Sequence, residues 1–407
     1  MILLGHTFPP DIRVDKELQA LCGSGREIHL MTELGKDQKP LEIAYGGKGY
    51  IHRYSIKVRS ALLRFVTGAY FHLIRREYVK HIADFIVQND IQILHVHDLN
   101  FLPTVFYTIR KYKFDVKVVA DLHENMPAAW VAYRSDNCWP LRLLRSIIYN
   151  YRIWKRAEKK CFLQCAAVIA VVPEAKKRML EYGVDPKKIW VVSNTENQQT
   201  FPFSREQANA EIIQKYQDDF VISYIGGLGP HRGMQTLIKG FERIANEMPS
   251  ARLLIVGAKQ KDSVAIQKML AKVKDPLIRG RVEIIGWVPF SDVNSYVLAS
   301  NVCTVPHEDF EHTQTTIPHK LFQYMICRSP VLVSDCAPLK RIIGDNDAGY
   351  VFKAGDSASL ASAVREMNSN WAEVKRRVEK AFDLAAGEYS WTRDAERLKK
   401  MYQEILN

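Results

Sequence analysis

The chain has 407 residues, of which 47% are hydrophobic and 25% are charged, a composition that is ordinary for a globular protein of about two domains. Its formal net charge is +12, and residues 1–200 contain 30 lysines and arginines against 20 acidic residues, whereas residues 201–407 contain 27 against 25. This uneven charge favours an acidic partner for the first half.

Cysteine usage and hydrophobicity exclude further classes of protein. The seven cysteines are scattered and include no Cys-x-x-Cys pair, which supports neither a zinc site nor a disulfide framework and favours a reducing compartment. The chain opens on a strand-like run rather than a signal-peptide pattern, and its most apolar stretches are too short to span a bilayer. We therefore expect a cytoplasmic protein, either soluble or peripheral on the inner face of the cell membrane.

Short β-branched runs alternate with helical patterns in both halves, which is typical of parallel sheets with crossover helices. The predicted strands of the first half cover residues 2–5, 27–31, 93–97, 116–121, 167–172 and 189–192. Those of the second half cover residues 221–225, 251–256, 282–285, 302–305, 331–334 and 349–352. The polar segment 194–218 separates the two series, and an amphipathic pattern over residues 389–407 predicts a last helix. This order predicts an α/β protein with two Rossmann-like domains in tandem and a ligand held between them.

Polar residues of the first half lie where predicted strands end. Asp11 follows the first strand, where it can cap a helix, and Arg13 comes two residues later. His123 and Glu124 follow a buried strand, at the edge of the sheet where α/β folds bind their ligands. These four residues are therefore candidates for a binding site.

A pair of histidines raises the question of a metal. His95 and His97 lie on the same face of one predicted strand, and Asp98 follows them. No third ligand occurs at a useful spacing, so we expect no metal here and place His97 or Asp98 at an acceptor cleft instead.

Two basic runs stand out, at residues 57–80 and 142–160. In the first of them the basic residues interleave with apolar ones, which fits either a core helix with a solvated basic face or an interfacial helix. An interfacial helix would contact anionic lipid or a lipid-pyrophosphate acceptor. Nucleic acid is disfavoured because no recognised binding motif accompanies the charge.

A glycine-rich loop follows the first predicted strand of the second half. Gly226, Gly227 and Gly229 let backbone N–H groups approach a diphosphate, and Arg232 can supply charge-assisted hydrogen bonds. A Walker A loop is excluded because the chain has no Gly-Lys-Ser/Thr. A dinucleotide fingerprint is disfavoured because Arg232 stands where its third glycine belongs and no acid follows the next strand. The loop therefore favours a phosphate site other than that of a P-loop NTPase or a dehydrogenase.

Residues 306–335, PHEDFEHTQTTIPHKLFQYMICRSPVLVSD, are the most informative about function. Pro318 can occupy the first turn of a helix, and Lys320 and Gln323 then lie one turn apart near its N-terminus. A helix N-terminus with a cation beside it is suited to binding a diphosphate.

The run Pro-x-Lys-Leu-Phe-Gln-Tyr-Met, followed by Pro-Val and Ser-Asp, resembles the donor-site element of retaining, family-four-type glycosyltransferases with the GT-B fold. The loop that ends at Arg232 resembles the diphosphate-binding loop of these enzymes, and the strand end at His123 resembles their Thr/Asp-x-His. The start of the chain, with Asp11 and Arg13, is similar to the Pro-x-Asp-x-Arg-Val opening of many polysaccharide transferases. The resemblance extends over nearly the whole chain.

This resemblance implies an acceptor domain at residues 1–200, a nucleotide-sugar donor domain at 201–386 and a closing helix at 387–407 that crosses back to the first domain. It implies that Arg232 and Lys320 hold the leaving diphosphate without a metal, while His123 positions the sugar. The backbone of the turn at Trp287 and Val288 is expected to contact the nucleobase.

The same resemblance points to one departure from the family pattern. Thr315 and Gln323 occupy the places of two family glutamates, the second of which binds the ribose hydroxyls. Gln323 can still accept one hydroxyl proton, but it lacks a carboxylate's charge. Residues expected on the acceptor side are Asp11, Arg13, His97 and Glu124.

The expected function is that of a retaining, metal-independent glycosyltransferase that needs no cofactor. It moves a sugar from a nucleoside-diphosphate sugar to a glycan, such as a lipid-linked precursor of a surface polysaccharide. One alternative is a catalytically silent subunit that binds nucleotide sugars, indicated by the loss of both glutamates. The other is a nucleotide-sugar epimerase on the same fold, disfavoured because few carboxylates occur in the first domain's candidate cleft.

Overall fold

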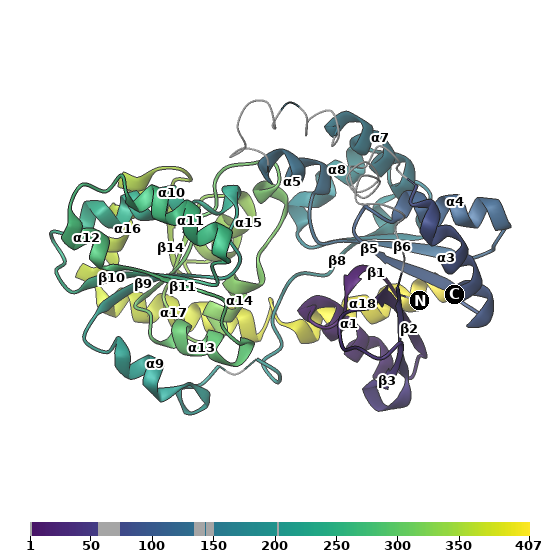
Figure 1. Ribbon diagram of the computed structural model, residues 1–407, viewed down its shortest axis with the longest axis horizontal. Coiled ribbons are helices and arrows are strands. Elements are labelled where there is room, and N and C mark those ends of the chain that lie inside the picture. Colours follow the sequence, from purple (N-terminus) through teal and green to yellow (C-terminus); the bar gives the residue numbers. More distant parts are fainter. Residues whose placement is uncertain (1, 56–73, 134–142, 144–149, 202) are drawn as a thin grey trace. The chain divides into compact units, whose positions relative to one another are not determined.

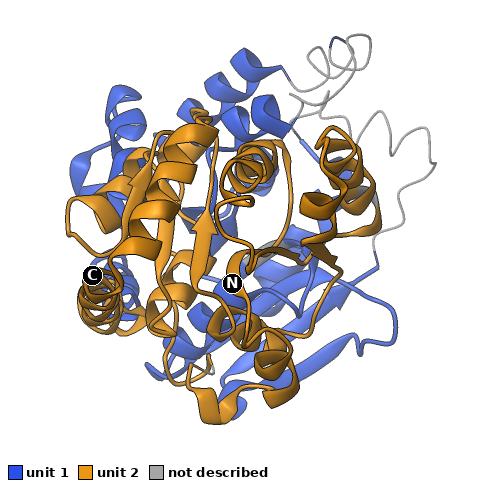
Figure 2. Cartoon of the chain, turned by 90° about the vertical axis from the view of Figure 1, so that its left-hand side faces the viewer, with its two compact units in different colours: residues 1–193, 394–407 blue, residues 194–393 orange. Residues whose placement is uncertain are grey.

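The computed structural model describes residues 2–55, 74–133, 143, 150–201 and 203–407. These residues form two compact units, coloured separately in Figure 2. Unit 1 comprises Met1–Ser193 together with Asp394–Asn407, and unit 2 comprises Asn194–Arg393.

Unit 1 contains an eight-stranded sheet in the order β3-β4-β2-β1-β5-β6-β7-β8, and all its strand pairs are parallel except β3 with β4 (Figure 1). Its strands are β1 (Ile2–Thr7), β2 (Ile28–Glu33), β3 (Leu41–Ala44), β4 (Gly49–Tyr54), β5 (Ile93–His97), β6 (Lys117–Leu122), β7 (Ala167–Ala170) and β8 (Ile189–Val191). Strands β3 and β4 were not predicted from the sequence. They form an edge hairpin, and their runs, LEIA and GYIHRY, each contain a single β-branched residue, so neither reads as a β-branched run.

The helices of unit 1 are α1 (Ile12–Cys22), α3 (Arg76–Gln88), α4 (Leu102–Tyr112), α5 (Met126–Tyr133), α7 (Tyr151–Phe162) and α8 (Lys176–Glu181). The last helix of the chain, α18 (Trp391–Leu406), belongs to this unit from Asp394 onwards. It is held there in part by Tyr402, whose hydroxyl lies 2.8 Å from Nδ1 of His95 on β5. No helix in the described parts of the chain is long and apolar enough to cross a membrane.

Unit 2 contains a parallel six-stranded sheet in the order β11-β10-β9-β12-β13-β14. Its strands are β9 (Phe220–Ile225), β10 (Ala251–Val256), β11 (Val282–Ile285), β12 (Val302–Val305), β13 (Val331–Ser334) and β14 (Tyr350–Phe352). Its helices are α9 (Ala210–Lys215), α10 (Met234–Ile244), α11 (Gln260–Leu270), α12 (Pro276–Gly280), α13 (Phe290–Leu298), α14 (His319–Ile326), α15 (Ala337–Leu339), α16 (Ser357–Ser369) and α17 (Trp371–Ala386). In Figure 1, α10 and α16 lie on one side of this sheet and α13 and α17 on the other.

The strand order of unit 2 places its ligand site. The chain runs outward from β9 through β10 to β11 and then returns to β12 on the other side of β9. Such a reversal leaves a crevice at the carboxyl ends of the two neighbouring strands, and open α/β sheets bind ligands there. The loops that follow β9 and β12 therefore form the expected site.

Candidate functional site

The loop after β9 depends on two glycines. Gly226 has φ +128°, and a Cβ atom there would lie 2.9 Å from Nζ of Lys320. Gly233, at the start of α10, has φ +69°, and its Cβ would lie 1.6 Å from the carbonyl oxygen of Pro306. Both positions combine a left-handed backbone with close packing, so a side chain at either would move the loop.

Lys320 reaches this loop from α14. Pro318 is the N-cap of the helix in an extended conformation, so the predicted place for it in the first turn was wrong by one residue. One turn after Lys320, the hydroxyl of Tyr324 lies 3.2 Å from the backbone nitrogen of Ile225 and 3.3 Å from its carbonyl oxygen. These bonds hold α14 against the carboxyl end of β9, which places Lys320 under the glycine loop.

The Lys320 amine is buried without an acceptor. The residue is 8% exposed, and its Nζ has no hydrogen-bond partner among the described residues. It lies 3.4 Å from the centroid of the Tyr224 ring, a cation–π contact. Burial, together with the charge of Arg232, lowers the pKa of Lys320 well below its usual range. Such a group is stabilised by an anion, and a bound phosphate would supply one.

Arg232 supplies a second cation at the same edge of the sheet. Its Nη1 lies 2.8 Å from Nε2 of His307, on the loop after β12. Because a guanidinium can only donate, His307 must accept through Nε2 and carry its proton on Nδ1. Burial, followed by the charges of Arg232 and Lys320, lowers the pKa of His307 well below its usual range, which keeps this ring neutral.

Gln323 and Thr315, which stand in the places of the two family glutamates, make different hydrogen bonds. The Gln323 amide nitrogen donates to the Glu196 carboxylate at 2.9 Å, and both residues are buried. The Thr315 hydroxyl donates to the carbonyl oxygen of Glu311 at 2.9 Å. Glu196 was not a candidate in the sequence analysis, and no local signal identifies it because it lies far from Gln323 along the chain.

The remaining donor-side candidates lie on the same unit. Trp287 follows β11 and is 77% exposed, so its side chain is available to a ligand or partner, while Val288 is half-buried. Gly227 has no atom within 4 Å of where its Cβ would be, and Gly229 has an extended backbone. The glycine loop therefore has open space beside Gly227.

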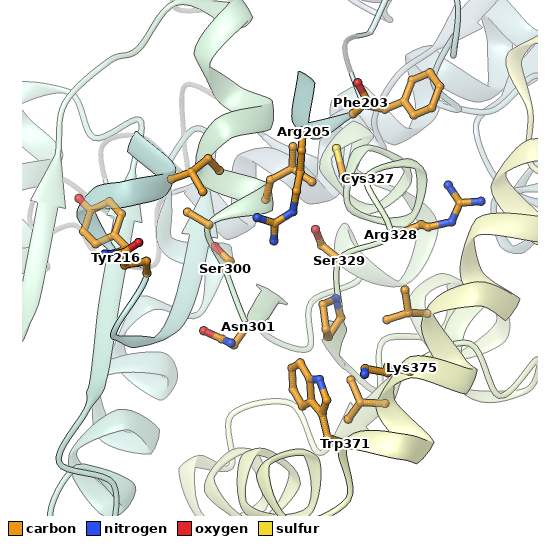
Figure 3. Close-up of a pocket in the computed structure, with 18 of the residues that line it drawn as sticks. Phe203, Arg205, Tyr216, Ser300, Asn301, Cys327, Arg328, Ser329, Trp371 and Lys375 are labelled. Carbon is orange, nitrogen blue, oxygen red and sulfur yellow. The ribbon is translucent and has the colours of Figure 1, made fainter. Parts of the chain in front are cut away.

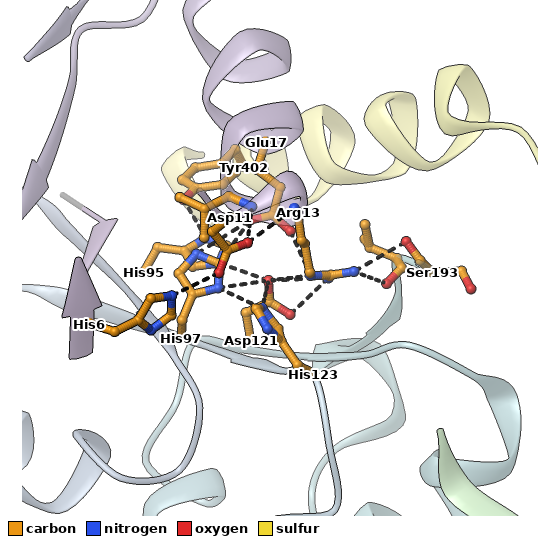
Figure 4. A network of polar contacts seen from close by, with 12 residues as sticks. His6, Asp11, Arg13, Glu17, His95, His97, Asp121, His123, Ser193 and Tyr402 are labelled. Atoms are coloured by element: carbon orange, nitrogen blue, oxygen red, sulfur yellow. Dashed lines mark hydrogen bonds and ion pairs between the residues drawn. The ribbon is translucent and has the colours of Figure 1, made fainter. Parts of the chain in front are cut away.

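In unit 1, a network of polar side chains lies at the carboxyl ends of the central strands (Figure 4). Arg13 Nη2 lies 2.9 Å from Asp121 Oδ1, its Nε lies 3.0 Å from Glu17 Oε1, and its Nη1 donates to the carbonyl oxygens of Val192 and Ser193 at 3.1 Å. Arg13 is 2% exposed. The structure therefore revises the expected acceptor-side role of Arg13, because its guanidinium is buried and engaged within the unit.

Four of these buried residues carry metal-ligand atoms, namely Glu17, His95, His97 and Asp121, and one ligand atom from each lies within 4.8 Å of the others. This grouping is not visible in the sequence because Glu17 and Asp121 lie on other elements than the two histidines. Arg13 contacts both carboxylates and supplies the positive charge that a cation would. Burial opposes ionisation of Asp121, but Arg13 and then His95 lower its pKa well below its usual range. Burial and the neighbouring charge of Asp121 raise the pKa of Glu17 well above its usual range.

His123 lies at the exposed end of this network. Its Nε2 is 2.8 Å from Nδ1 of His97, and its side chain is 20% exposed. His97 itself is buried, so the structure does not favour its expected contact with an acceptor. It contacts His123 on the buried side of that ring instead. Asp98, at the end of β5, is half-buried with φ +63° and remains an acceptor-side candidate.

The other two acceptor-side candidates have local partners. Asp11 caps α1 by accepting from the backbone nitrogens of Arg13 and Val14, and lies 3.1 Å from Nε2 of His6. Burial opposes ionisation of Asp11, but the bond to His6 and nearby charges lower its pKa. Glu124 accepts from the hydroxyl of Tyr133 at 2.8 Å.

A groove with a volume of about 750 Å³ occurs elsewhere in unit 2 (Figure 3). Its lining includes Asp219, Asn301 and Pro330, which immediately precede β9, β12 and β13. The groove thus lies at the amino ends of the strands, opposite the end that carries Lys320. We do not assign the nucleotide site to it.

Two sequence families match the chain. Residues 14–195 match the family described as Glycosyltransferase Family 4, and residues 219–370 match Glycosyl transferases group 1. Among curated relatives, alpha-D-kanosaminyltransferase of Streptomyces kanamyceticus is 22% identical over 256 residues, 62% of this chain and 64% of its own length. The capsular polysaccharide biosynthesis glycosyltransferase CapM of Staphylococcus aureus is 21% identical over 295 residues, 69% of this chain and 73% of its own length. The match to the first of these relatives thus spans less than two thirds of its length.

Solved structures show the fold. Sucrose-phosphate synthase from Thermosynechococcus elongatus superposes with a TM-score of 0.78 at 15% identity, covering 100% of this chain and 98% of that one. Anabaena Alr3699/HepE in complex with UDP-glucose superposes with a TM-score of 0.72 at 13% identity, covering 99% of each chain. The fold is therefore GT-B, as predicted. With family matches over both units and this fold, the chain belongs to the family-4-like, group 1 glycosyltransferases.

Proposed function

We propose that this protein is a retaining, metal-independent glycosyltransferase that transfers a sugar from a nucleoside-diphosphate sugar to a glycan acceptor. Lys320 and Arg232 bind the diphosphate and stabilise it as it leaves. His123 positions the sugar, the departing phosphate helps to deprotonate the acceptor hydroxyl, and the new bond forms on the face that the nucleotide leaves. The relatedness to CapM supports a polysaccharide acceptor.

The observation that carries this proposal is the Lys320 amine. A buried ammonium without an acceptor destabilises the folded chain, and here it lies beneath Gly226, at the crevice of the unit 2 sheet, with Arg232 nearby. A diphosphate satisfies both cations at once. HepE, which shares the fold, was solved with UDP-glucose, so UDP is the first nucleotide to test.

The decisive experiment is calorimetric titration of the wild type with UDP, GDP and ADP in buffer that contains EDTA. We expect one nucleotide to bind in the micromolar range, and the Arg232→Ala, Lys320→Ala variant to lose that binding. Failure of all three to bind would refute the donor site. Product analysis by NMR with the matching donor then tests retention, because a retaining enzyme preserves the anomeric configuration of the sugar.

A silent nucleotide-sugar-binding subunit is the second candidate, favoured by Thr315 and Gln323. It binds the nucleotide as above but turns over no donor. Release of nucleoside diphosphate that depends on an added glycan acceptor would exclude it.

We also propose that unit 1 meets an anionic surface or a lipid-linked acceptor through α7. Trp154 and Glu158 of this helix are buried, whereas its exposed residues include Arg152, Ile153, Arg156, Lys159 and Lys160. Such a basic face with apolar residues is suited to anionic lipid. The run at 57–80 lies largely outside the described residues, as does the first part of the run at 142–160.

Sedimentation with vesicles that contain phosphatidylglycerol tests this surface. We expect binding at low salt that weakens at high salt and is reduced when Arg152, Arg156 and Lys159 are changed to Glu. A matched control changes three exposed lysines of unit 2, Lys239, Lys268 and Lys272, to Glu. Equal loss in both variants, or no binding at low salt, would refute a specific role for α7.

A further inference from the structure

Two side-chain hydrogen bonds connect the segment after β8 to the helix that carries Lys320. The Gln323 amide nitrogen donates to Glu196 Oε2 at 2.9 Å, and the Asn194 amide nitrogen donates to the carbonyl oxygen of Ile317 at 2.8 Å. All four residues belong to unit 2. Glu196 is 2% exposed and Gln323 is 6% exposed, so the bond between them is shielded from water.

The bond to Glu196 decides which way the Gln323 amide faces. A carboxylate can only accept hydrogen bonds, so the amide nitrogen of Gln323 must point toward Glu196 and its carbonyl oxygen must point away. That carbonyl oxygen has no hydrogen-bond partner among the described residues and is not one of the fully buried unpaired atoms. Gln323 therefore presents an acceptor one helical turn from Lys320.

We propose that Glu196 is a positioning residue of the donor site, which turns the Gln323 carbonyl oxygen toward a ribose hydroxyl of the bound nucleotide. This inference rests on the proposed function, in which Lys320 and Arg232 hold the diphosphate of the same nucleotide. The ribose is covalently joined to that diphosphate, so an acceptor beside the cations is within its reach.

Glu196 also supplies charge. A hydrogen bond donated to a carboxylate polarises the amide, which makes its carbonyl oxygen a stronger acceptor in a buried site. Glu196 thus supplies, through the Gln323 amide, the negative charge that a glutamate at position 323 would carry. Glu196 is itself oriented by the backbone nitrogen of Asn197, which donates to its Oε1 at 3.0 Å.

The competing explanation is that the bond between Glu196 and Gln323 only fastens the segment to α14. Asn194 provides the matched control, because its bond to Ile317 fastens the same segment to the start of the same helix without involving Gln323. The two explanations differ in one measurable quantity, the preference for a ribose over a ribose that lacks hydroxyls.

The experiment compares the affinity for UDP with that for 2′,3′-dideoxy-UDP, with the corresponding GDP and ADP pairs alongside. We expect the wild type to bind the ribonucleotide about tenfold more tightly, the size of one hydrogen bond to a polarised acceptor. In Gln323→Leu the preference should vanish, and in Glu196→Gln it should fall to about twofold. The Asn194→Ala control should keep the wild-type preference even if it melts at a lower temperature.

A double variant tests whether misfolding of the single variants explains their loss of the ribose preference. Glu196→Gln combined with Gln323→Glu keeps one donor, one acceptor and one negative charge in the buried pair, and we expect it to recover the preference. An unchanged preference in Glu196→Gln, or an equal loss in Asn194→Ala, would overturn the inference and leave the proposed function standing. Absence of nucleotide binding by the wild type would overturn both.

Discussion

Replacing Lys320 by methionine should make unit 2 more stable while weakening nucleotide binding. The variant keeps the apolar stem of the side chain beside the Tyr224 ring but removes a buried ammonium that has no hydrogen-bond acceptor among the described residues. A buried unsatisfied polar group costs about 1–3 kcal/mol, and a charged one costs more than this, whereas the cation–π contact that is lost stabilises by about 2 kcal/mol or somewhat more at a desolvated site. The cost exceeds the gain, so we expect a net stabilisation of about 1 kcal/mol.

In a unit of about 200 residues this corresponds to a rise in melting temperature of roughly 2–4 °C. Affinity for the nucleoside diphosphate should fall by about 10- to 150-fold, the effect of losing one charge-assisted hydrogen bond of about 1.5–3 kcal/mol. Differential scanning calorimetry measures the first quantity and titration calorimetry the second. The matched control is Lys340→Met, at an exposed lysine of the same unit, which should change neither by more than experimental error.

The stabilisation should also depend on pH. The pKa of Lys320 is lowered by burial and by Arg232, so between that pKa and the ordinary lysine value the unfolded chain binds more protons than the folded chain. The contribution of Lys320 to the free energy of unfolding of the wild type therefore rises with pH through that window. The stability advantage of Lys320→Met over the wild type should shrink from pH 7 towards pH 10. A variant that melts below the wild type at pH 7, or that still binds nucleotide with full affinity, would refute the reasoning.

Four further perturbations test other parts of the structure. Gly226→Ala should weaken nucleotide binding at least tenfold in titration calorimetry, because its Cβ would lie 2.9 Å from Nζ of Lys320 at a φ of +128°; full affinity would contradict the described loop. Arg13→Met should destabilise unit 1 by about 3–5 kcal/mol in denaturant unfolding followed by circular dichroism, since it leaves buried carboxylates unpaired; a change below about 1 kcal/mol would argue against the network. Gln323→Glu places two carboxylates in one buried pair with Glu196, which raises a carboxyl pKa, so the variant should lose stability relative to the wild type as the pH rises from 5 to 8; a difference in melting temperature independent of pH would contradict this. Dialysis against EDTA should change neither the melting temperature nor nucleotide affinity, and stoichiometric metal in the purified protein by mass spectrometry would contradict a metal-independent site.

The features that the sequence predicted correctly are those that neighbouring residues encode. Every predicted strand overlaps an observed one, because runs of β-branched residues between turn residues are a local signal of buried strands. The glycine loop and the helix that carries Lys320 were also identified from local signals, namely closely spaced glycines and a proline at the start of the helix. The hairpin of β3 and β4 was missed because each of its strands contains only one β-branched residue, so the local signal used for the other strands is weak there.

The roles of individual polar residues depended instead on partners distant in the chain. Arg13 was predicted on the acceptor side of the site, but its guanidinium is buried and pairs with Asp121, 108 residues away. Gln323 was interpreted as the loss of a carboxylate from the site, but its amide donates a hydrogen bond to the carboxylate of Glu196, 127 residues away. Neither pairing leaves any trace in the local pattern around these residues.

By itself, the sequence of this protein determined which segments form most of its strands and helices and which of them are candidates to hold a diphosphate, since both follow from the spacing of apolar residues, glycines and charges within a few positions. Only the tertiary structure decided which polar groups are exposed to a ligand and which are used to hold the fold. That distinction depends on burial and on pairing across the sheet, because burying an unpaired charge costs free energy and so favours pairing.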